Sequence, residues 1–195
     1  MDSCPFVDPT ELTEQQLAQI ERLASQLVDD RSKDVFREID GLFANIYGLD
    51  DRDIQVLTDT LDVRNPNDET GERGSARVEE PEAALFVAEV KRFLAPFARR
   101  VNVKLKVTLD GGIDSSTYRF LRITAADGPP QLGGEIDEST LELATRTGAS
   151  RIIQRGDHRL IVGILNQYRY WTPSRARLLA ADVLREYFSA FEAVR

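Results

Sequence analysis

The fold is decided by one segment of the sequence, LIVGILNQYRYWTPS at residues 160–174. Residues 160–165 are apolar and predict a buried β-strand. Thr172 is a favourable helix N-cap, and Pro173 fits the first helical position, where its missing N–H is not needed. The helix that follows has an apolar face formed by Leu179, Val183, Leu184, Tyr187, Phe188 and Phe191. A strand therefore leads directly into a long C-terminal helix that packs back on the sheet.

The residues before this segment supply the rest of the sheet. Gly156-Asp157 is a strong hairpin-turn signal, and a helix is expected over residues 137–147 between two hairpins. The expected strands cover residues 101–109, 118–125, 151–154 and 159–165. The order is β-β-α-β-β-α, which predicts a four-stranded antiparallel sheet with the final helix covering one face.

In the first hundred residues, apolar side chains recur with the 3.6-residue period of an α-helix. Thr13 and Gln16 fit a capping box, Asp50 can cap a later helix, and Pro96 is expected to shorten or kink the last one. The four expected helices cover residues 10–31, 32–48, 50–61 and 81–99. The fold class is therefore α+β, with a helical lobe over 1–100 and an α+β lobe over 101–195, expected to form one compact unit.

The charge of the chain is unevenly distributed. The net charge is −8, but residues 1–100 carry −10 and residues 101–195 carry +2. From residue 151 onward, 8 Lys/Arg face 4 Asp/Glu. An acidic front and a mildly basic back suit a protein that docks a partner with one end. Alternatively, the charge asymmetry reflects ordinary variation of surface charge and has no role in docking.

The sequence limits the compartment and the chemistry. A single cysteine, Cys4, excludes an internal disulfide, and neither a signal peptide nor a membrane-spanning apolar run is present, so a cytoplasmic protein that does not enter the membrane is expected. His158, the only histidine, lies at the expected hairpin tip, which leaves no Cys-His nucleophile pair and no zinc site built from such ligands.

Residues 110–114, Asp-Gly-Gly-Ile-Asp, can hold a divalent ion but lack EF-hand spacing, so a turn is favoured. We expect no catalytic residue, metal or cofactor. An enzyme that uses carboxylates in the loops of the sheet is the remaining catalytic alternative.

The best candidate binding site is the corner between the last strand and the last helix. Aromatic rings there can stack on bases, and guanidinium groups can neutralise phosphate. Two cations in the first turn of a helix oppose its dipole, so a bound anion would offset them. In the alternative, two of the rings seal the sheet against the helix and the arginines are solvated. The candidate residues for binding nucleic acid or a partner are Gln167, Tyr168, Arg169, Tyr170, Trp171, Arg175 and Arg177.

Two passages resemble a known family. Residues 46–61, IYGLDDRDIQVLTDTL, and residues 166–177, NQYRYWTPSRAR, are similar to the C-terminal segment of adenine-specific DNA methyltransferases of restriction-modification and phage-defence systems. The catalytic Asn/Asp-Pro-Pro-aromatic motif of that family is absent. The nearest approach, Asn-Pro-Asn-Asp at 65–68, lacks both the second proline and the aromatic residue that would stack a flipped base.

The resemblance implies a separate small subunit that works beside such an enzyme. We therefore expect a non-catalytic accessory subunit of a bacterial DNA-modification or phage-defence complex, with a larger protein as its partner and DNA as a second candidate partner. The alternative is a protein-interaction or regulatory adaptor with no nucleic-acid contact.

Overall fold

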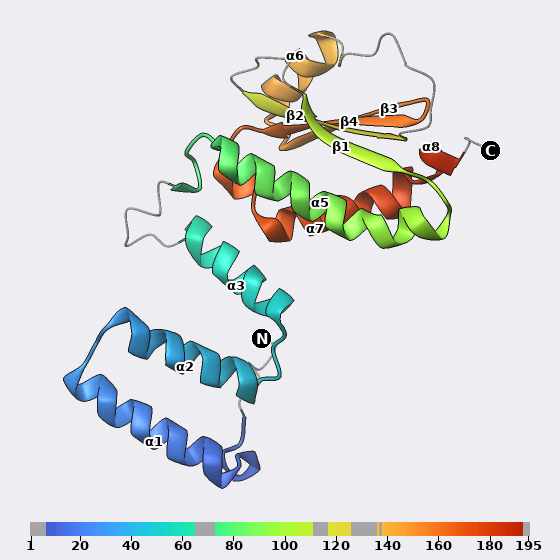
Figure 1. Cartoon of the computed structure of the whole chain (residues 1–195). Helices are drawn as coiled ribbons and strands as arrows, with labels where there is room; N and C mark the ends of the chain where they lie inside the picture. Colours follow the sequence, from blue (N-terminus) through green and yellow to red (C-terminus); the bar gives the residue numbers. More distant parts are fainter. Residues whose placement is uncertain (1–6, 65–72, 111–116, 126–135, 137, 193–195) are drawn as a thin grey trace. The chain divides into compact units, whose positions relative to one another are not determined.

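The computed structural model describes residues 7–64, 73–110, 117–125, 136 and 138–192 (Figure 1). Residues 65–68 and 111–114, considered above, lie outside the described residues. The chain divides into two compact units, Met1–Thr58 and Asp59–Arg195. The division lies there rather than at residue 100 because the fourth expected helix packs on the sheet.

The first unit is helical. It contains a short 3-10 turn, Pro9–Glu11, the helices α1 (Glu14–Asp29) and α2 (Lys33–Ile46), and the start of α3 (Asp51–Arg64). The expected capping box of α1 is present, because the Gln16 backbone N–H donates to Thr13 Oγ1 at 3.2 Å while the Gln16 side chain accepts from the Thr13 N–H at 2.9 Å.

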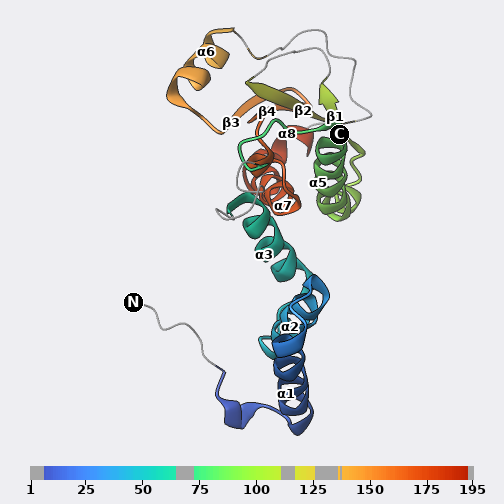
Figure 2. The same cartoon turned by 90° about the vertical axis from the view of Figure 1, so that its left-hand side faces the viewer.

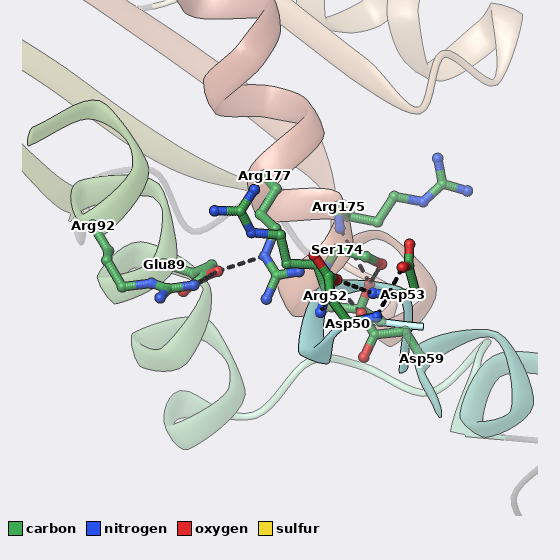
Figure 3. Close-up of polar contacts among 10 residues, drawn as sticks. Asp50, Arg52, Asp53, Asp59, Glu89, Arg92, Ser174, Arg175 and Arg177 are labelled. Atoms are coloured by element: carbon green, nitrogen blue, oxygen red, sulfur yellow. Dashed lines mark hydrogen bonds and ion pairs between the residues drawn. The ribbon is translucent and has the colours of Figure 1, made fainter. Parts of the chain in front are cut away.

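Asp50 caps α3 as expected. Its carboxylate accepts from the backbone N–H groups of Arg52 at 2.7 Å and Asp53 at 3.1 Å, and the Asp53 side chain accepts from the Asp50 N–H at 3.1 Å (Figure 3). These reciprocal bonds satisfy donors that the first helical turn leaves unpaired. The helix start is therefore encoded locally.

The second unit is built on a four-stranded sheet. All three strand pairs are antiparallel, in the order β1-β2-β4-β3. The strands are β1 (Leu105–Asp110), β2 (Tyr118–Ala125), β3 (Arg151–Gly156) and β4 (Arg159–Leu165). The β3–β4 turn places His158 at a φ of 58°, in the left-handed region that tight hairpins require. The expected α+β fold and its β-β-α-β-β-α order are confirmed.

Helices lie on both faces of this sheet. Helices α5 (Glu80–Arg100) and α7 (Pro173–Asp182) cover one face, and α6 (Glu138–Thr147) lies over the other (Figures 1 and 2). The main core lies between the sheet and the α5–α7 pair, where Phe86, Val90, Leu121 and Val162 are at most 1% exposed. The side chains that face the core here, including Leu179 of α7 and Val183 just after its end, follow the expected apolar pattern.

The largest departures from the expected boundaries lie between α5 and β1 and in the C-terminal helix. Helix α5 continues through Pro96 to Arg100, and Asn102 then adopts a φ of 56° that ends it, with the Val103 N–H donating to the Ala98 carbonyl at 2.9 Å. Strand β1 therefore begins at Leu105, four residues later than the alternating pattern predicts. The C-terminal helix is divided into α7, a π-helical turn at Val183–Tyr187, and α8 (Ser189–Glu192). No described helix combines the length and the apolar character needed to cross a bilayer.

Candidate binding site at the strand-to-helix corner

The corner is fixed by backbone hydrogen bonds and a helix cap. After β4 ends at Leu165, the Asn166 N–H donates to the Thr117 carbonyl at 2.8 Å, and Tyr168–Tyr170 form a 3-10 turn. Thr172 caps α7 through its side-chain oxygen, and Pro173 is the first helical residue. The sequence thus predicts this helix start correctly, and it brings the candidate residues together on one short segment.

Two of the aromatic rings are part of the core. Trp171 is 1% exposed, its Nε1–H donates to the Leu165 carbonyl at 2.9 Å, and its ring centroid lies 4.9 Å from that of Phe86. Tyr168 is 7% exposed, and the Arg73 guanidinium lies 4.3 Å from its ring centroid. Burial raises the pKa of the Tyr168 hydroxyl. Trp171 packs in the core between the sheet and the helices, Tyr168 is buried with Arg73 over its ring, and neither ring offers an open face to a base.

Two of the arginines are engaged within the chain. Arg169 donates from Nε to the Gly74 carbonyl at 2.9 Å and from its terminal nitrogen to the Ser75 hydroxyl. Arg177 donates from Nε to Glu89 at 2.7 Å, and both side chains are less than one-fifth exposed (Figure 3). Arg92 binds the same carboxylate at 2.6 Å, and the hydrogen bonds from Arg92 and Arg177 lower the pKa of Glu89.

A carboxylate of the chain itself already binds the N-terminus of α7. The Ser174 backbone N–H donates to Asp59 Oδ2 at 2.8 Å, and Asp59, from α3, is only 5% exposed (Figure 3). The expectation that an external anion would offset Arg175 and Arg177 at this helix end is corrected, because a carboxylate of the chain itself fills the position. No local sequence signal connects residues 115 positions apart.

Arg175 is the exception among the arginines. It is exposed, and its side chain extends away from Glu89 in Figure 3. In the described part of the chain, its guanidinium makes no hydrogen bond or ion pair. Gln167 and Tyr170 are half-buried. The accessible cation of the corner is therefore Arg175.

A groove of about 290 Å³ lies beside Arg175, and we term it the α7 groove. Tyr170 and Arg175 are the two predicted site residues that line it. The other lining residues are Phe86, Ser150, Arg151, Ile164, Leu178, Leu179 and Asp182. The sequence analysis missed Arg151 and Asp182. A signal existed for Asp182, because Arg175, Leu178 and Asp182 follow the i, i+3, i+7 spacing of one helix face.

The first unit presents exposed aromatic side chains on its surface. Phe36, Phe43 and Tyr47 lie along α2 and just past its end, and they are 47%, 44% and 43% exposed. We term these three residues the aromatic stripe; Phe43 and Tyr47 stack with centroids 6.5 Å apart. Only Leu23 and Val35 are buried hydrophobic residues among those described in this unit. Its apolar faces therefore remain largely uncovered.

The first unit also carries all of the net charge. Residues 1–58 contain 13 Asp/Glu and 5 Lys/Arg, a net charge of −8, whereas residues 59–195 contain 20 of each. The aromatic stripe therefore lies on a strongly acidic unit. Elsewhere, the described residues contain no cluster of three or more His, Cys, Asp or Glu side chains suited to a metal ion. No family model, curated protein or solved structure matches the chain, so its function has to be argued from this geometry.

Proposed function

We propose that the protein is a non-catalytic accessory subunit that docks a larger enzyme through the aromatic stripe and contacts DNA through the strand-to-helix corner. The observation that carries the proposal is the exposure of Phe36, Phe43 and Tyr47 on a unit whose described residues include two buried apolar side chains. The similarity of residues 46–61 and 166–177 to methyltransferase C-terminal segments supports a DNA-modification or phage-defence complex in the cytoplasm as the setting.

The exposed rings favour a protein partner on energetic grounds. Covering a half-exposed aromatic side chain contributes roughly 1 kcal/mol, so three rings on one helical face provide a useful anchor. Contiguous apolar patches rimmed by polar residues commonly mark protein interfaces. The helix-in-groove mode, in which an amphipathic helix lays its apolar face into a groove, fits the i, i+7, i+11 spacing of the stripe.

Charge defines the chemistry of that partner. The net charge of −8 on residues 1–58 disfavours a second copy of the same unit, because like charges across an interface are repulsive. It favours an apolar groove rimmed by Lys and Arg. Such a rim also accelerates association at low ionic strength.

An affinity pull-down of the tagged protein from its own host tests the docking. We expect a stoichiometric large enzyme that survives nuclease treatment and is lost with Phe43→Asp. Val28→Asp is the matched control, because Val28 is 77% exposed, lies on α1 outside the stripe and undergoes the same apolar-to-acid change. Equal loss in both variants, or no stoichiometric enzyme with the wild type, contradicts the proposal.

The adaptor without nucleic-acid contact is the second candidate. It is favoured by the burial of Tyr168 and Trp171 and by the engagement of Arg169 and Arg177 within the chain. This candidate predicts partner recovery that is unchanged by nuclease and by Arg175→Glu. DNA recovery that depends on Arg175 would exclude it.

A further inference from the structure

The α7 groove combines an apolar base with a cationic mouth. Phe86, Ile164 and Leu179 are almost fully buried and line it, while Leu178 is 56% exposed and borders the opening. The half-buried Tyr170 adds an aromatic side chain. A flat group can therefore pack against Tyr170 and Leu178, the apolar lining residues that are accessible, while a charged group stays near solvent.

The charges around the groove are unequal. Arg151 pairs with Asp182 at 2.7 Å and neutralises it, while Arg185 lies 3.3 Å from Asp182 and pairs more closely with Glu186 at 2.6 Å. Arg151 remains 39% exposed despite its ion pair. Arg175 has no ion-pair partner in the part of the chain that the structure describes. The mouth of the groove is therefore net positive and suited to an anion.

We infer that the α7 groove binds a single nucleotide, with its base against Tyr170 and Leu178 and its phosphate at Arg175. Guanidinium groups bind phosphate through charge-assisted hydrogen bonds, and aromatic side chains stack on bases of any identity. Because Asp59 occupies the backbone N–H at the start of α7, the phosphate is held by the Arg175 side chain and not by the helix end. The inference rests on the DNA contact in the proposed function and narrows it.

The size of the groove restricts the form in which a nucleotide can enter it. A volume of about 290 Å³ lies near the lower end of the range of roughly 300–1,000 Å³ typical of small-molecule sites. A duplex keeps its bases stacked inside and cannot insert one without flipping it out. The ligand is therefore an unpaired nucleotide, either free or within a single strand.

Fluorescence anisotropy with the full chain at low salt tests this site, with a labelled oligothymidylate as the probe. Arg175→Glu is expected to weaken binding by at least about tenfold, because it replaces a phosphate-binding cation with an anion. Leu178→Ala is expected to weaken it severalfold, because it removes the apolar contact with the base without changing any charge. Arg146→Glu is the matched control, since Arg146 is 75% exposed on α6 and makes the same charge change outside the groove.

Competition with unlabelled ligands distinguishes a free nucleotide from a nucleotide within a single strand. Displacement of the probe by unlabelled thymidine monophosphate supports a free nucleotide, whereas displacement only by unlabelled single strand supports a strand-borne one. Wild-type affinity in Arg175→Glu or Leu178→Ala, equal displacement of the probe by unlabelled duplex, or no binding of the probe overturns the inference. Partner docking in the pull-down depends on Phe43 and not on this groove, so failure here is distinguishable from failure of the docking proposal.

Discussion

The bond between Asp59 and α7 allows a quantitative test of what holds the second unit together. Asp59 Oδ2 accepts from the Ser174 N–H at 2.8 Å, and the carboxylate is almost fully buried. Two arginines follow in the first turns of the same helix, where positive charge is unfavourable. Asp59→Ala removes both the acceptor and the compensating charge, whereas Asp59→Asn keeps an acceptor and removes only the charge.

The magnitude follows from the separate contributions. Losing a helix-capping acceptor costs about 1 kcal/mol, and losing a favourable charge at a partly buried helix end costs about 0.5–2 kcal/mol. We therefore expect Asp59→Ala to lower the free energy of unfolding by about 1.5–3 kcal/mol. Asp59→Asn should lower it by roughly 1 kcal/mol, which reflects the charge alone.

Trp171 provides the assay. It is the only tryptophan of the chain, it is 1% exposed, and it lies immediately before Thr172, the cap of α7. Its fluorescence during urea unfolding therefore reports the stability of the second unit. Glu142→Ala is the control, because Glu142 is 70% exposed and its 3.9 Å ion pair with Arg146 should contribute less than about 1 kcal/mol.

One outcome would refute the reasoning directly. If Asp59→Ala unfolds at the same urea concentration as Glu142→Ala, the bond to Ser174 is not a stabilising cap. If Asp59→Asn is as destabilised as Asp59→Ala, the charge accounts for the whole effect and the acceptor for none.

Two further predictions concern the pH dependence and the packing of the same unit. The pKa of Glu89 is lowered in the folded state, so its stabilising effect is fully present above its unfolded pKa of about 4.3 and is lost as the pH falls through the folded value. Glu89→Gln should therefore cost roughly 1–3 kcal/mol near neutral pH in urea unfolding and less at about pH 3, and a pH-independent difference would contradict the ion-pair explanation. Gly163→Ala should cost about 1–3 kcal/mol, because the added Cβ would lie 2.9 Å from the Phe120 ring. Gly41→Ala, with nothing within 4 Å, should be neutral or stabilising by thermal unfolding; equal destabilisation in both would indicate a backbone effect instead.

The sequence predicts structure best where a signal is local. The Thr13–Gln16 capping box, the Asp50 cap and the Thr172-Pro173 helix start each depend on residues within one turn. The alternation over 101–109 failed at its first residues for a related reason. Asn102 can adopt the left-handed conformation that ends α5, and this local choice overrides the period-two pattern before Leu105.

The candidate site depends on contacts between distant residues, which the sequence does not specify. Arg175 and Arg177 are equivalent in the sequence as cations near a helix start. The fold places Glu89 of α5 beside Arg177, while Arg175 faces solvent. Sequence reasoning identified the corner but not which arginine stays accessible. Nor could it show that Asp59 would supply the anion, because that contact requires the tertiary arrangement of α3 and α7.

The confinement of the net charge to residues 1–58 has a consequence for solubility. Residues 59–195 contain equal numbers of acidic and basic side chains, so this part of the chain lies close to its isoelectric point near neutral pH. Proteins without net charge associate and precipitate more readily, because no long-range repulsion keeps the molecules apart. The acidic first unit supplies that repulsion for the whole molecule. A partner whose basic rim neutralised this unit would also remove the main source of colloidal stability, so the free protein should self-associate less readily than the protein bound to such a partner.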